Sequence, residues 1–249
     1  MRSRVVTATA FAVLVVVCSA GPVFGQAPAE PPKIWTVTAS AGLALTSGNS
    51  DTSTINLAYD LTYDPQTKNV IKSDALYFRG DTEGELSAHR TGINVRDEYK
   101  LTERIFVFGQ NQFLKDQFKD IDFLVAPTGG VGYKIINTAT TKFSVDGSAG
   151  VVWEKNPGFD VNTSGALATG EKLTHALTGN TTLSQTFMGL WKTDDFEDAL
   201  FTLGVSIAAS MSTRTQLKVE AIDTYKNKPP LQTIQANDVA VLISLVYKM

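Results

Sequence analysis

Apolar and polar residues alternate at every second position through most of this chain, which is the pattern of a β-strand with two different faces. One strict run covers residues 35–46, and its apolar positions are Trp35, Val37, Ala39, Ala41, Leu43 and Leu45. The same period recurs over 54–63, 93–100, 143–154, 201–211, 216–221 and 238–249. Sustained helical spacing is absent from the chain. The pattern therefore predicts an all-β protein.

Weaker strands bring the expected number to 12, and they lie near 70–79, 104–114, 122–136, 166–177 and 181–191. The runs exceed the ~5–6 residues of a typical globular strand and suit the ~9–11 residues that a tilted strand needs to cross a membrane. Pro127 interrupts one of them, and it predicts a bulge or bend because proline cannot donate to a strand ladder.

The connections between these strands are predicted to alternate in length. The long ones fall at 47–51, 80–88, 115–121, 156–165, 192–198 and 226–237, and the short ones at 64–69, 102–103, 137–140, 178–180 and 212–213. Outer-membrane barrels have short periplasmic turns and longer external loops. The fold class we predict is an up-and-down antiparallel transmembrane β-barrel of about 12 strands, with both termini on the periplasmic side.

Aromatic residues lie near the ends of the expected strands, where membrane barrels carry aromatic girdles; they are Trp35, Tyr63, Tyr99, Trp153, Trp191 and Tyr247. The last strand is apolar at alternate positions up to Met249. Such an end resembles the segment by which the outer-membrane assembly machinery takes up barrel proteins, although their last residue is usually aromatic.

Charged residues gather on the opposite face of the strands, where exposure to lipid would cost about 2–4 kcal/mol for each base near the midplane. We therefore expect a lumen lined by Asp60, Arg96, Glu98, Lys100, Asp146, Lys218, Glu220 and Asp238, with Glu154 on the same face. Two readings stay open. The charges pair as structural packing that fills the barrel, or they form the selectivity region of a narrow pore.

The chain start has the composition of a secretory signal peptide over residues 1–25, with Arg2 and Arg4 before an apolar run and small residues after it. A Pro- and Ala-rich lead-in follows at 26–34, and the barrel is expected over 35–249. Loss of both arginines changes the net charge from −3 to −5. The single cysteine, Cys18, lies within the signal, and Val17 before it does not suit lipidation.

Composition excludes several classes of protein. Without Cys18 there is no disulfide, thiolate nucleophile or cysteine metal site. The negative charge and the absence of a basic block argue against nucleic-acid binding. Beyond the signal, no uninterrupted apolar stretch approaches the length of a membrane-spanning helix, which is roughly 20 residues.

Catalytic signals are poor, so we predict no enzyme, cofactor or metal. His89 and His175 are expected near opposite sides of the membrane, and neither is followed two residues later by serine. Residues 165–172 resemble a phosphate loop, but Glu171 stands where its lysine should be. The acidic segment 194–198 lacks the ligand spacing of a calcium loop, which favours a solvated external loop.

Short motifs in order along 35–249 resemble one family of Gram-negative barrels, the salt-stress-induced outer-membrane proteins, whose biochemical function is unknown. The resemblance rests on segments 43–51, 101–108, 116–118, 130–133 and 225–230, followed by Asp238. The family often has an arginine at the position held here by Leu124. The resemblance implies an outer-membrane location, and it supplies neither substrate nor catalytic residues.

The sequence thus favours an outer-membrane barrel of a diderm bacterium that acts in envelope adaptation or as a narrow channel for small solutes. Its expected partners are the lipid bilayer, lipopolysaccharide, the assembly machinery through the C-terminal strand, and small solutes. Two other classes stay open: a barrel enzyme acting on lipid or glycan, and a soluble periplasmic β-sandwich that binds a ligand in a cleft.

Overall fold

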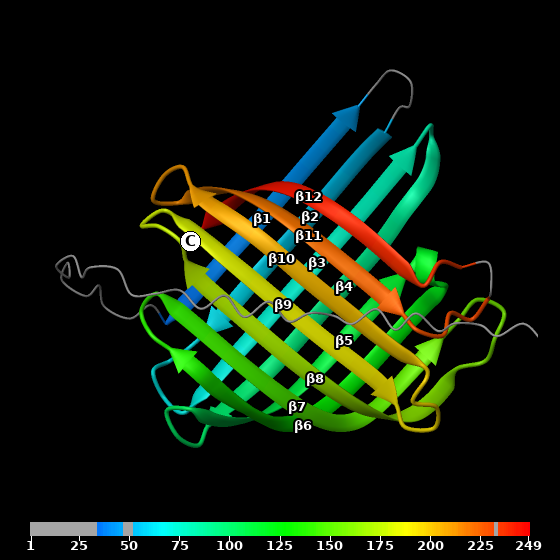
Figure 1. Ribbon diagram of the computed structural model, residues 1–249, viewed down its shortest axis with the longest axis horizontal. Coiled ribbons are helices and arrows are strands. Elements are labelled where there is room, and N and C mark those ends of the chain that lie inside the picture. Colours follow the sequence, from blue (N-terminus) through cyan, green and yellow to red (C-terminus); the bar gives the residue numbers. More distant parts are fainter. Residues whose placement is uncertain (1–33, 47–51, 232–233) are drawn as a thin grey trace, which may run out of the picture. The chain divides into compact units, whose positions relative to one another are not determined.

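The computed structural model describes residues 34–46, 52–231 and 234–249, and these form one closed barrel of antiparallel strands (Figure 1). The strands are β1 (Trp35–Thr46), β2 (Thr52–Tyr63), β3 (Asn69–Thr82), β4 (Glu85–Lys100), β5 (Ile105–Asp116), β6 (Ile121–Asn137), β7 (Thr141–Lys155), β8 (Asn162–Ala176), β9 (Thr181–Lys192), β10 (Ala199–Ser210), β11 (Thr215–Lys226) and β12 (Asn237–Lys248). The predicted fold class is confirmed, and the soluble sandwich is wrong because the sheet closes on itself.

Each strand pairs with its sequence neighbours, and β1 closes the barrel on β12. That last pairing is short: it runs from Thr38 opposite Lys248 to Ala41 opposite Leu245. By contrast, β1 and β2 pair along their whole length. We call the end of the barrel with Trp35 and Lys248 the inner end. The opposite end, on the right of Figure 1, is the outer end.

The predicted alternation of connection lengths is wrong in two places. The expected long connection 115–121 is only 117–120, which is no longer than the inner connection 101–104. The other place is 80–88. There β3 and β4 continue to a turn at Glu83 and Gly84, where both residues have a positive φ. A two-residue turn of this kind joins antiparallel strands directly. The remaining outer connections are 117–120, 156–161, 193–198 and 227–236, of which residues 232–233 lie outside the described residues. The inner ones are 64–68, 101–104, 138–140, 177–180 and 211–214. The outer connection 47–51, the signal peptide and most of the lead-in lie outside the described residues.

Pro127 does not cause the predicted bulge. The β6–β7 ladder is interrupted at this proline, but it resumes in the same register, since Val125 faces Trp153 and Thr128 faces Gly150. The register shift lies further along, between Lys134 and Ile136. The missing N–H of proline thus opens a gap in the ladder without inserting a residue.

The predicted two-faced pattern is visible in the exposure of the strands. The odd-numbered positions of β12 are among the most exposed apolar residues, with Val239 and Val241 at 64%, while Leu242 next to them is 2% exposed. Aromatic rings mark both strand ends: Trp35 packs on Tyr63 at the inner end, with centroids 4.3 Å apart, and Trp191 packs on Phe201 toward the outer end, at 5.2 Å.

A short 3-10 turn, η1 (Gln117–Lys119), joins β5 to β6. Among the described residues, no helix is long and apolar enough to cross a membrane.

Candidate functional site

Ion pairs between strands that are not neighbours in the sheet identify the interior of the barrel. Arg96 on β4 donates to Asp146 on β7, with Nη2 and Oδ2 2.9 Å apart. Strands β5 and β6 lie between them in the wall. Because a side chain cannot pass through the sheet, these two groups meet inside the barrel.

Arg96 is the centre of a group of polar and aromatic contacts that we call the inner cluster. Its Nε lies 2.9 Å from Oε1 of Glu98, and its Nη1 donates to Gln110 at 3.0 Å. Its guanidinium lies 3.5 Å from the ring centroid of Phe108, a favourable cation–π stack. Glu98 also accepts from Lys72 at 2.7 Å. A planar guanidinium with two carboxylate neighbours is held in one orientation.

Glycine makes room for this arrangement. A Cβ at Gly132 would lie 2.1 Å from Cζ of Phe106, whose ring is 5.6 Å from the guanidinium carbon of Arg96. A Cβ at Gly170 would lie 2.8 Å from the carboxylate of Asp146. Small residues on β6 and β8 thus let the larger side chains of β5 and β7 fill the interior.

Other charges of the inner face are exposed. The side chain of Lys72 is 42% exposed, and Asp60, Asp74 and Lys172 are exposed as well. Asp60 on β2 stands directly opposite Asp74 on β3. Like charges at facing positions are unfavourable unless water or a cation screens them. This part of the interior therefore has the character of a hydrated space.

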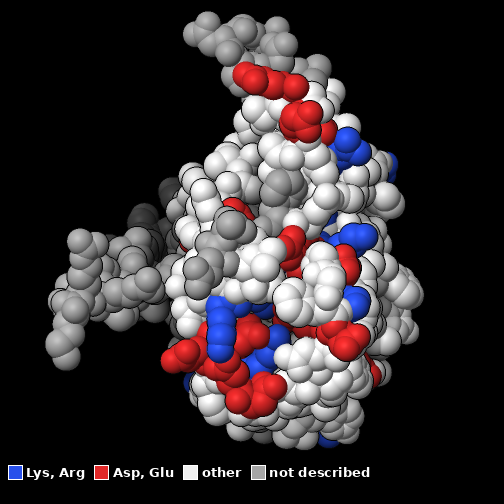
Figure 2. Space-filling view, turned by 90° about the vertical axis from the view of Figure 1, so that its right-hand side faces the viewer, with Lys and Arg blue, Asp and Glu red and all other residues white. Residues whose placement is uncertain are grey.

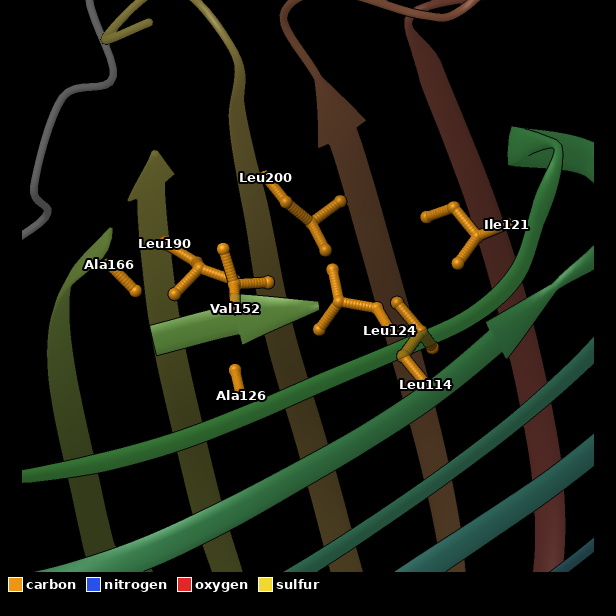
Figure 3. Close-up of a cluster of buried hydrophobic side chains, with 8 residues drawn as sticks. All are labelled: Leu114, Ile121, Leu124, Ala126, Val152, Ala166, Leu190 and Leu200. Carbon is orange, nitrogen blue, oxygen red and sulfur yellow. The ribbon is translucent and has the colours of Figure 1, made fainter. Parts of the chain in front are cut away.

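The outer half of the interior is packed with apolar side chains (Figure 3). They come from β5, β6 and β7 on one side and from β8, β9 and β10 on the other, and they meet between the walls. The members are Leu114, Ile121, Leu124, Ala126, Val152, Ala166, Leu190 and Leu200, which we call the apolar cluster. None is more than 5% exposed, so water is excluded from the apolar cluster.

Beside the apolar cluster lies a four-membered ion network of Glu154, Lys192, Lys226 and Asp198. Glu154 on β7 pairs with Lys192 on β9 (2.9 Å) and with Lys226 on β11 (2.7 Å). Asp198, just before β10, pairs with Lys192 (2.5 Å) and Lys226 (3.3 Å). The side chains of Glu154 and Lys226 are 2% exposed. Two ammonium groups thus alternate with two carboxylates, and the network is neutral.

Two further contacts tie opposite walls together near the outer end. Arg90 on β4 donates to Thr224 on β11 and, at 3.5 Å, to Thr202 on β10. The fully buried Lys119 of η1 donates to the carbonyl of Ala236 at 2.9 Å and pairs with Asp238 at 2.7 Å. These ties cross the interior of the barrel near its outer end.

The sequence-predicted candidates fall into separate groups. Arg96, Glu98 and Asp146 are brought together in the inner cluster. Lys218 and Glu220 pair with each other on β11, with Nζ and Oε2 2.8 Å apart. Among the described residues, neither forms an ion pair with a third charged group.

The remaining candidates lie toward the two ends. Lys100 pairs with Asp64 of the inner connection 64–68 at 2.9 Å. Asp60 accepts from Thr38 at 3.3 Å. Asp238 belongs to the outer ties with Lys119. The predicted set is therefore spread along the interior and is not one site.

Sequence reasoning missed most of the ion network. Lys192 and Lys226 each end a strand at an inner-face position, and Asp198 belongs to a segment that was interpreted as a solvated loop. The available signal was the two-residue period itself, which places both lysines on the face of Glu154. It does not reveal that side chains from β7, β9 and β11 meet in the interior.

Neither histidine belongs to a reactive constellation among the described residues. The Nδ1 of His89, on β4 near the outer end, lies 3.2 Å from Oε1 of Gln117. His175, near the inner end of β8, is 2.8 Å from Oγ1 of Thr141. Within the described part of the chain, no group of three His, Cys, Asp or Glu residues could hold a metal ion.

The outer rim carries charges of both signs, which Figure 2 shows gathered in the lower part of the outer end. Lys228 of connection 227–236 donates to Asp195 of connection 193–198. This hydrogen bond holds the pKa of the Asp195 carboxyl below its usual range, and backbone donors add to the effect. The contact joins two neighbouring outer connections.

Solved structures with this fold are outer-membrane barrels. The NanC porin is 9% identical over 86% of this chain and 100% of that one, with a TM-score of 0.52. An outer membrane channel from Pseudomonas putida F1 is 12% identical over 93% and 100% of the two chains, with a TM-score of 0.50. Identities this low show a shared fold alone.

No curated protein matches the chain in sequence. A family model does match, over residues 39–249. The chain therefore belongs to the family described as protein of unknown function, DUF481.

Proposed function

We propose that this protein is a channel for small solutes in the outer membrane of a diderm bacterium, with a role in adaptation of the envelope. The shortest strands, such as β1, have 12 residues. This exceeds the roughly 9–11 residues that a strand tilted by about 45° needs to cross the hydrocarbon core of a bilayer. The fold shared with porins supports the location. The resemblance to salt-stress-induced barrels supports the role in adaptation.

One observation carries the channel proposal: the inner half of the barrel holds paired charges beside exposed ones in a hydrated interior. The solvent-exposed Asp60, Asp74 and Lys172 need water, while Arg96 and Asp146 bridge the space. In this proposal the lumen is lined by Asp60, Arg96, Glu98, Lys100, Asp146, Lys218, Glu220 and Asp238. The apolar cluster closes the outer half, as a hydrophobic constriction does in channels that gate by dewetting.

Single-channel conductance of the refolded protein in a planar bilayer tests the proposal. We expect discrete current steps whose cation-to-anion preference changes in Arg96→Glu and Glu98→Lys. Asp97 lies between these residues in sequence and is exposed on the opposite face, so Asp97→Asn should leave the preference unchanged. Folding is verified independently by heat-modifiable migration and circular dichroism.

The apolar cluster supplies a second arm of this test. Leu124→Ser places a hydroxyl within the apolar cluster, and we expect longer or more frequent openings than in the wild type. Leu217→Ser, on the exposed face of β11, is the matched control. A silent bilayer from folded wild type and folded Leu124→Ser alike would contradict the channel, and the interior charges would then be structural packing.

A further inference from the structure

Asp198 differs from the other members of the ion network because it comes from a connection. Glu154, Lys192 and Lys226 belong to strands, and their side chains are at most 7% exposed. Asp198 ends connection 193–198, and its side chain is 18% exposed. It is thus the member that can leave without unfolding the barrel.

The lysines require two carboxylates. With Asp198 in place, Lys192 and Lys226 each contact two acidic groups, and the charges balance. Without it, Glu154 alone would face two buried ammonium groups. An uncompensated buried charge is strongly unfavourable, so the space beside the lysines favours another carboxylate over water alone.

Polar contacts at the rim hold connection 193–198. Asp194 accepts from Ser164 at 2.5 Å, Asp195 accepts from Lys228, and Asn227 donates to the carbonyl of Glu197 at 2.8 Å. The one large apolar residue of this connection, Phe196, is 59% exposed. Segments that bury little apolar surface open at low free energy.

A hollow at the outer rim is lined in part by Asn156, a residue that contacts the network. Its volume is about 400 Å³, and it is lined by Asn156, Phe159, Asp160, Val161, Asn162 and Pro230. Asn156 also donates from Nδ2 to Oε1 of Glu154, at 3.1 Å. A solute in this hollow is therefore one side chain away from the buried carboxylate that both lysines share.

We propose that Lys192 and Lys226 form a binding site for the carboxylate of a small acidic solute that enters from the outer end, and that Asp198 fills this site as a tethered substitute until the solute displaces it. The inference rests on the proposed channel function and names its solute class. Exchange of one carboxylate for another keeps the network neutral, so the exchange itself changes the electrostatic free energy little. The solute's other contacts, and the conformational freedom that connection 193–198 gains when Asp198 leaves, then favour displacement.

The test is binding of gluconate to the folded, detergent-solubilised protein by isothermal titration calorimetry, with sorbitol as a neutral probe of similar size. Because removing an internal competitor raises the fraction of competent sites, we expect Asp198→Asn to bind gluconate ~10-fold more tightly than the wild type. Sorbitol should bind neither protein. Asp97→Asn, which removes one carboxylate from the opposite face, should bind as the wild type does.

Two variants in the Asp198→Asn background locate the site. Lys226→Met should abolish the gained affinity. Lys226→Arg keeps the positive charge that Glu154 needs for folding, and it should retain most of the gained affinity. Equal affinities of wild type and Asp198→Asn would overturn the proposal, as would full retention in a folded Lys226→Met double variant.

Failure of this inference is distinguishable from failure of the channel. If the protein conducts in potassium chloride but Asp198→Asn gains no gluconate affinity, the channel proposal stands and the acidic solute class is rejected. If Asp198→Asn gains gluconate affinity but the protein never conducts, the binding site stands and the channel proposal is rejected.

Discussion

The two halves of the barrel interior are built from the same strands but have opposite character. In the outer half, eight apolar side chains form a buried cluster, and Glu154, Lys192 and Lys226 of the ion network are almost completely buried. In the inner half, Arg96 is fixed by several partners while Lys72, Asp60 and Asp74 stay exposed. One wall can thus be a packed core at one level and a hydrated lining at another.

The residues that alternate with the outward-facing positions decide the difference. Leucine, isoleucine, valine and alanine occupy the inner face of β5–β10 toward the outer end. Toward the inner end this face carries glycine, serine, threonine and charged residues, together with the rings of Phe106 and Phe108. Charges in the packed half have no water to replace a lost partner, whereas those in the open half do. Substitutions should therefore have unequal effects in the two halves.

The largest expected effect of a substitution is at Glu154, and it tests whether the two halves differ. Glu154→Gln removes the carboxylate that both Lys192 and Lys226 share, and breaking a buried pair costs about 3–5 kcal/mol. The free energy of unfolding in denaturant, for protein folded in detergent micelles, measures the loss. The matched change in the more exposed Lys218–Glu220 pair, Glu220→Gln, should cost no more than about 1 kcal/mol. Equal losses would show that the two halves do not differ in hydration.

A smaller effect is expected where glycine makes room in the inner half. Gly132→Ala places a methyl group against the ring of Phe106. Overpacking of this kind costs about 1–3 kcal/mol. A methyl group at Gly92 meets open space, so Gly92→Ala should change stability by no more than about 0.5 kcal/mol. The same unfolding measurement compares them. If both are neutral, the cation–π stack around Arg96 is loose, and the inner half is less ordered than its contacts imply.

The smallest expected effect sharpens the comparison at the exposed rim. In Lys228→Ala we expect the pKa of Asp195 to rise toward its usual value, because the hydrogen bond that lowers it is lost. The contribution of this pair is present above the unfolded-state pKa of the carboxyl and is lost as the pH falls through the lowered pKa. Carboxyl-carbon NMR titration measures the shift. An unchanged pKa would mean that backbone donors alone hold it down.

Much of the fold could be predicted from the sequence. The period of two from Trp35 to Thr46 indicated the outward-facing positions of β1. The recurrence of that period, together with five weaker strands, indicated 12 strands. The turn at Glu83 and Gly84 was missed because the flanking residues 80–88 are rich in polar side chains and glycine. Strand pairing keeps them extended, which composition alone does not reveal.

The candidate site could be predicted only in part. Arg96 and Glu98 stood out as charges on an inner face, and both lie in the inner cluster. The partnership of Arg96 with the distant Asp146 was not predictable, since it depends on the width of the closed barrel. Asp198 was interpreted as solvated because its acidic neighbours are, yet the barrel brings two lysines to it.

The sequence by itself determined which side chains face outward and which face inward, because an extended chain turns alternate residues to opposite sides. Only the tertiary structure decided which inward residues meet. Closure of the sheet fixes the distance across the barrel and the stagger between strands. As a result, the side chains of Glu154 on β7, Lys192 on β9 and Lys226 on β11 meet inside the barrel. The alternation in the sequence decides which face each residue lies on, and closure of the barrel decides which inward residues contact one another.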